Sequence, residues 1–117
     1  MSEREIALAE LENIRSEQAR LMDILQRAAV AQRKAGDKAE AARLRQECLR
    51  LSWQNLTLRR TADSIRLKGD LSDAVTKLRG IADSAKTTVS NIEAVADTLK
   101  RAAEFIDLLR RLLVVFK

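Results

Sequence analysis

The chain contains no proline and only three glycines among its 117 residues. Proline and glycine are the residues that most strongly disfavour a helix, so their scarcity leaves long stretches that nothing interrupts. The four commonest residues are alanine, leucine, arginine and glutamate, which are good helix formers. Aromatic residues make up 3 %, so a core must be built from aliphatic side chains between closely spaced helices. We therefore expect an all-α chain that forms one domain over residues 1–117.

Helix start and stop signals divide the chain into three parts. Capping sequences lie at Ser2–Glu5, Asp37–Glu40 and Asp70–Asp73, where an acceptor and negative charge meet the first turn of a helix. Gly36 and Gly69 each follow basic residues, as glycine does at helix ends in the left-handed conformation. The sequence therefore predicts helices over residues 2–35, 37–68 and 70–117. Turns this short make consecutive helices antiparallel, so we expect an antiparallel bundle of three long helices.

Each predicted helix carries an apolar seam with alternating steps of three and four residues, which is a heptad pattern. Polar side chains interrupt the seams at Gln18, Gln32 and Asn55. An amide at such a position typically fixes helix register or oligomeric state at some cost in stability, and we assign this register role to Asn55.

An alternative reading divides the third helix near residues 87–91. Thr87, Thr88 and Val89 form a β-branched run, and Ser90–Glu93 is another capping box. A four-helix bundle would result. The apolar seam passes through this region in phase, so we prefer one long helix over residues 70–117.

The predicted third helix is about 16 residues longer than the other two, or about 24 Å at 1.5 Å per residue. We therefore expect it to protrude, with residues 102–117 as an amphipathic C-terminal extension. This segment is the most apolar part of the chain. Three explanations remain open: association with a second copy or another protein, folding back as a fourth bundle helix, and lying in a membrane interface. The candidate contact residues are Phe105, Leu109, Leu112 and Phe116.

A second apolar stripe runs along the predicted helix of residues 37–68. Leu49, Trp53 and Leu56 lie well over 100° around the helix from the main seam, at about 100° per residue. Either the third helix covers this stripe, or it is an exposed surface that pairs subunits or binds a partner.

The residue inventory argues against catalysis. The chain has no histidine, no tyrosine and one cysteine, Cys48, so it lacks an ordinary neutral-pH base and a zinc ligand set. We expect no cofactor, no metal site and no enzymatic activity. The net charge of +5 is modest and both signs are interspersed, which makes nucleic-acid binding an unfavoured reading. No secretory signal is apparent, and the lone cysteine fits a reducing compartment, so a cytoplasmic location is expected.

These features indicate a non-enzymatic helical interaction or assembly module. We expect it to form a homo-oligomer or to dock on a protein partner through apolar helix faces. The alternative is a peripheral membrane-binding protein that uses the amphipathic C-terminal helix.

Overall fold

The computed structural model describes residues 1–116, apart from the side chains of Val95 and Ala96. Over these residues the chain is helical, without a strand. The helices are α1 (Glu3–Lys34), α2 (Lys38–Trp53), α3 (Asn55–Leu67), α4 (Ser72–Ser90) and α5 (Val95–Val115). The predicted all-α antiparallel bundle is therefore confirmed.

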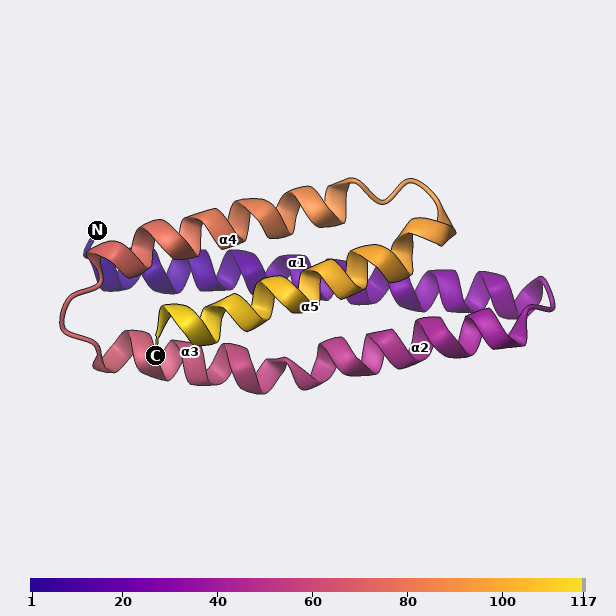
Figure 1. Ribbon diagram of the computed structural model, residues 1–117, viewed down its shortest axis with the longest axis horizontal. Helices are drawn as coiled ribbons and strands as arrows, with labels where there is room; N and C mark the ends of the chain where they lie inside the picture. Colours follow the sequence, from indigo (N-terminus) through magenta and orange to yellow (C-terminus); the bar gives the residue numbers. More distant parts are fainter. Residues whose placement is uncertain (117) are drawn as a thin grey trace.

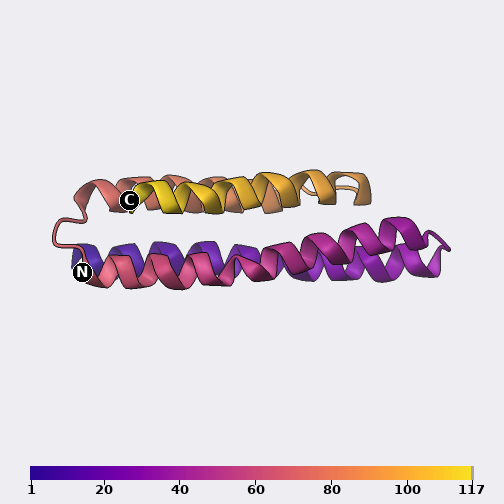
Figure 2. The ribbon, with the colours of Figure 1, turned by 60° about the horizontal axis from the view of Figure 1, so that its bottom comes forward.

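The helices form an elongated bundle that measures 53 × 23 × 19 Å. α2 and α3 follow one another with a slight bend, so the chain makes four passes along the long axis (Figure 1). Figure 2 shows two layers: α1 lies with α2 and α3 in one, and α4 lies with α5 in the other. α5 contacts α2 and α3 as well as α4, which closes the bundle. The far end of the α1–α2 hairpin extends beyond the α4–α5 layer in both views.

The turn between α1 and α2 has the predicted chemistry. Gly36 has φ +89°, and its N–H donates to the Arg33 carbonyl at 3.1 Å. The Asp37 N–H reaches back to the Gln32 carbonyl at 2.9 Å, which completes a Schellman motif. The Asp37 carboxylate then accepts from the Glu40 N–H at 3.0 Å and caps α2. At the chain start, the Ser2 hydroxyl caps α1 in the same way.

The second predicted glycine stop is wrong in detail. Gly36 is the only glycine with positive φ, so Gly69 does not adopt the left-handed conformation. α3 ends instead at Leu67, and its C-cap Lys68 has an extended backbone. Asp70 accepts hydrogen bonds from the N–H and hydroxyl of Ser72, and α4 begins there. These bonds hold the pKa of the Asp70 carboxyl below its usual range.

The single helix predicted over residues 70–117 is also wrong. The chain leaves the helix after Ser90, reaches an extended Ala94, and begins α5 at Val95. The four-helix alternative is therefore correct, with the break slightly later than residues 87–91. The Ser90–Glu93 box does not cap α5, because Ala94 is the N-cap and no side chain caps the helix there.

Residues 102–116 consequently do not protrude, and the last residue of the predicted extension, Lys117, lies outside the described residues. The inner face of α5 fills the bundle between α4 and the α2–α3 pair. The physical reason is the hydrophobic effect, because a straight helix would have left this apolar face in water. The buried residues of this face are Ala102, Phe105, Ile106, Leu108, Leu109 and Leu112.

Candidate functional site

The most distinctive surface is the outer face of α2 and α3. Leu49, Trp53 and Leu56 are 57 %, 71 % and 52 % exposed, respectively. We call these three residues the ridge. They follow one another at steps of four and three, so they line one side of the helical path. The sequence left open whether another helix covers this stripe. Within the described residues none does.

The ridge is held outward by the core residues of the same helices. Leu44, Leu51 and Leu58 are fully buried and face α1 and α5. Their seam fixes the rotation of α2 and α3 about their axes, which leaves the opposite side in solvent. Trp53 is the last residue of α2, so the largest side chain of the ridge stands where the two helices meet.

A polar interaction shapes this junction. The Gln54 N–H donates to the Leu51 carbonyl at 3.0 Å, a tighter bond than the regular one to the fourth residue back. The buried Gln18 amide of α1 donates to the same carbonyl at 2.6 Å. A side chain that enters the backbone ladder in this way is a recognised cause of helix bending. Gln18 therefore couples α1 to the bend beside the ridge.

The bend also explains the error at Asn55. The sequence placed Asn55 in the buried seam as a register residue, but its side chain is exposed. Asn55 is the first residue of α3 and directly follows the tightened turn at Gln54, and the buried seam continues at Leu58. The seam position assigned to Asn55 is therefore wrong, and the polar seam position that holds a buried hydrogen bond is Gln18.

Cationic side chains surround the ridge. Arg45 lies one helical turn before Leu49, and Arg60 lies one turn after Leu56. Both are exposed, and neither they nor Arg59 form an ion pair within the described part of the chain. Residues 37–69 contain eight basic and four acidic residues, which is a net charge of +4 out of +5 for the whole chain. The surface thus has an apolar centre and a positive rim.

A shallow hollow of about 290 Å³ adjoins the ridge, lined by Gln26, Arg45, Cys48 and Leu49. Cys48 is buried, and burial raises the pKa of its thiol, although a hydrogen bond with Gln26 opposes this effect. The Cys48 thiol also lies 3.8 Å from the Met22 carbonyl. A neutral thiol in this position serves packing between α1 and α2.

The C-terminal contact residues are placed differently from the ridge. Phe105, Leu109 and Leu112 are 0 % exposed, so they are core residues and not a free binding surface. Phe116 is half-buried, and the Lys68 ammonium lies 5.6 Å from its ring centroid. The structure does not bring these four residues together with the ridge, because α5 directs them into the bundle.

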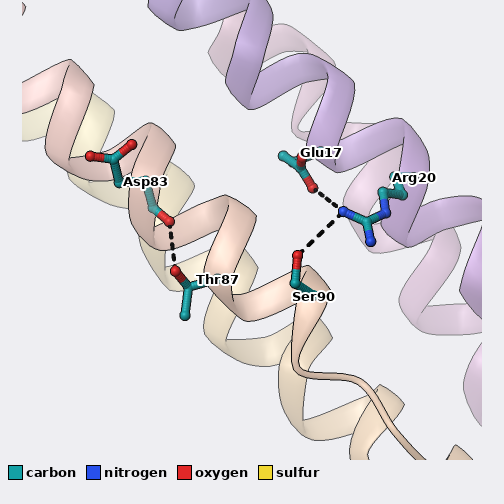
Figure 3. Close-up of polar contacts among 5 residues, drawn as sticks. All are labelled: Glu17, Arg20, Asp83, Thr87 and Ser90. Atoms are coloured by element: carbon teal, nitrogen blue, oxygen red, sulfur yellow. Dashed lines mark hydrogen bonds and ion pairs between the residues drawn. The ribbon is translucent and has the colours of Figure 1, made fainter.

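A polar groove of about 390 Å³ runs between α1 and α4. At one end of it, Arg20 donates to the Glu17 carboxylate at 3.3 Å and to the Ser90 hydroxyl at 3.4 Å (Figure 3). The Thr87 hydroxyl nearby is bound to the Asp83 carbonyl at 3.0 Å. These contacts join α1 to the end of α4.

The described residues contain no group of three or more His, Cys, Asp or Glu side chains that could hold a metal ion. They also contain no helix with the length and apolarity that crossing a membrane requires.

The sequence predicted the apolar residues of the ridge but not the cationic residues around it. Arg45, Arg59 and Arg60 could have been found from the uneven charge of the middle third together with helical spacing. Comparison of the chain with protein-family models, with curated proteins and with solved structures gives no match.

Proposed function

We propose that this chain is a non-enzymatic docking module that binds a protein partner through the ridge. The observation that carries the proposal is the exposure of Trp53 between two exposed leucines on one helix face. Tryptophan is enriched among the residues that dominate the energy of protein interfaces, and contiguous exposed apolar groups mark such interfaces.

The size of the ridge is consistent with reversible binding. Burying each of the three side chains offers about 1.5–3 kcal/mol, so the ridge supplies on the order of 6 kcal/mol. That gross amount is similar to the lower estimates of the cost of association, about 4 kcal/mol and upward. Apolar burial alone therefore gives weak binding, and the surrounding charges must add affinity and specificity.

The membrane alternative receives no support from the placement of α5. An interfacial helix needs its apolar face available to lipid, whereas Phe105 and Leu109 are core residues. Lipid binding through α5 would require the bundle to open and expose its core.

Site-specific photo-crosslinking in the host cell tests the proposal. Trp53 is replaced by the photoreactive residue benzoylphenylalanine, and adducts are resolved by mass after irradiation. We expect discrete protein adducts at this position that disappear when Leu49→Ser and Leu56→Ser are added. The control carries the same photoreactive residue at Thr76, an exposed position on α4, and should give no such adducts. Identical adduct patterns at positions 53 and 76, or none at either, would contradict the proposal.

A further inference from the structure

We infer that the ridge docks an acidic amphipathic helix of another protein, with carboxylates on both sides of a short apolar stripe. This inference rests on the proposed function and adds the chemistry of the partner. It is carried by the charges around the ridge, which restrict what can lie against Leu49, Trp53 and Leu56.

Exposed arginines stand at both ends of the ridge. Arg45 precedes the ridge and Arg60 follows it, about 15 residues apart, which spans about 22 Å of helix. Arg50 stands on the other side of the helix path and pairs with Glu47 at 2.8 Å, whereas Arg45, Arg59 and Arg60 form no ion pair within the described residues. A partner helix of about four turns would therefore place its apolar residues on the ridge and its carboxylates on the guanidinium groups at either end.

The same charges disfavour a second copy of this chain as the occupant of the ridge. In an antiparallel pairing of two ridges about Trp53, Arg45 of one copy meets the neighbourhood of Arg60 in the other. In a parallel pairing, each arginine meets its own counterpart. Both arrangements bring guanidinium groups that form no ion pair within the described residues together at the edge of an interface, which costs binding free energy. The nearby Asp63 carboxylate already pairs with Arg66 of its own chain at 3.3 Å.

A uniformly anionic surface fits the charges around the ridge less well than a peptide does. The exposed Asp63 lies among the cations on this side of α3. A lipid headgroup layer or a phosphate backbone would bring negative charge against this carboxylate as well as against the arginines. A helix carries charge residue by residue, so it can place acids at Arg45 and Arg60 and a neutral residue near Asp63.

Titration with synthetic helical peptides tests the inference, with Trp53 fluorescence of the full chain as the readout. One 18-residue peptide without tryptophan carries a leucine stripe flanked by glutamates, and its matched control carries lysines in place of those glutamates. We expect the glutamate peptide to shift Trp53 emission to the blue and to bind about tenfold or more tightly than the lysine peptide at 0.15 M salt. Higher salt should weaken this binding.

Charge-reversal variants test whether the arginines around the ridge cause the preference for the glutamate peptide. Arg45→Glu together with Arg60→Glu should reverse the peptide preference, because the rim then attracts lysine. Lys86→Glu together with Lys100→Glu makes the same change in net charge on exposed positions of α4 and α5, and should leave the preference for the glutamate peptide intact. Circular dichroism of each variant verifies the helical fold.

Several outcomes would overturn the inference. They are equal binding of both peptides, an unchanged preference in the Arg45→Glu, Arg60→Glu variant, and a larger Trp53 shift with phosphatidylserine vesicles or single-stranded DNA than with the glutamate peptide. A photo-adduct of twice the chain's own mass would overturn it while supporting the proposed function. Absence of protein adducts at position 53 would count against the proposed function itself.

Discussion

At the residue scale, the glycines at the two interhelical turns, Gly36 and Gly69, have different structural roles despite similar surroundings. Gly36 has φ +89°, and a Cβ built there would meet nothing within 4 Å. A Cβ at Gly69 would also meet nothing within 4 Å, but that residue does not have positive φ. Comparing substitutions at the two positions therefore separates the effect of backbone conformation from the effect of steric contact.

Gly36→Ala should lower the free energy of unfolding by about 1–2 kcal/mol, because an L-residue is strained in the left-handed conformation. Gly69→Ala should leave it nearly unchanged or raise it by up to about 1 kcal/mol, because alanine restricts the unfolded chain. Urea denaturation followed by circular dichroism measures both. Equal losses in the two variants would mean that the Gly36 turn does not require glycine.

The Cys48 thiol gives a prediction about pH. Burial raises the pKa of this thiol in the folded chain, so folding favours the protonated form. Its contribution to stability is complete below the pKa of the unfolded thiol and is lost as the pH rises through the folded pKa. We expect stability to fall at alkaline pH more steeply in the parent chain than in Cys48→Ala, as measured by urea denaturation across pH.

Alkylation of the Cys48 thiol by iodoacetamide near neutral pH should also be slower in the folded chain than in urea. Equal rates would show that the thiol is accessible.

At the element scale, the main finding is that α5 turns back into the bundle. Its apolar face was recognisable from the sequence, but its destination was not. The seam through Ala85 and Val89 stays in phase up to the break, so periodicity alone gave no sign of Asn91–Ala94 leaving the helix. The decisive quantity was the cost of leaving the apolar face of residues 102–112 in water, which depends on the tertiary partners available.

The burial of α5 predicts a large effect of core truncation. Phe105→Ala should lower the free energy of unfolding by about 3–5 kcal/mol, a large share of the roughly 5–15 kcal/mol typical of a domain. Leu113→Ala on the same helix is the control, because Leu113 is half-exposed and should cost much less. Thermal denaturation followed by circular dichroism compares them. If Phe105→Ala melts at the parent temperature, α5 is not part of the cooperative core.

The predicted elements show which local signals survive in the tertiary structure. Caps at Ser2 and Asp37 formed because their acceptors bind N–H groups within the same turn. Asn55 failed as a seam residue because a distant side chain, Gln18, participates in the bend that precedes it. The exposed ridge could be named from its spacing, whereas its lack of a covering helix followed only from the path of α5.

At the scale of the whole molecule, the bundle is longer than a compact domain of this size. The Cα radius of gyration is 15.5 Å, compared with about 13 Å expected for a compact chain of this length. Small-angle X-ray scattering should give an elongated particle with the mass of one chain, 13.1 kDa, across a tenfold range of concentration. Constant mass follows from the like charges around the ridge. A mass that doubles with concentration would show self-association.

The four passes of the bundle have one more consequence. Because α1 begins and α5 ends at the same end of the long axis, the chain returns close to its starting point (Figure 1). A short glycine–serine linker could therefore connect the termini, and the circle could be opened at the Gly36 turn at the opposite end. Such a circular permutant would retain every helix and its neighbours. α2 would become the first helix of the polypeptide and α1 the last, although the two would still pack side by side. The permutant would therefore have the same arrangement of helices in space with a different order of helices along the chain.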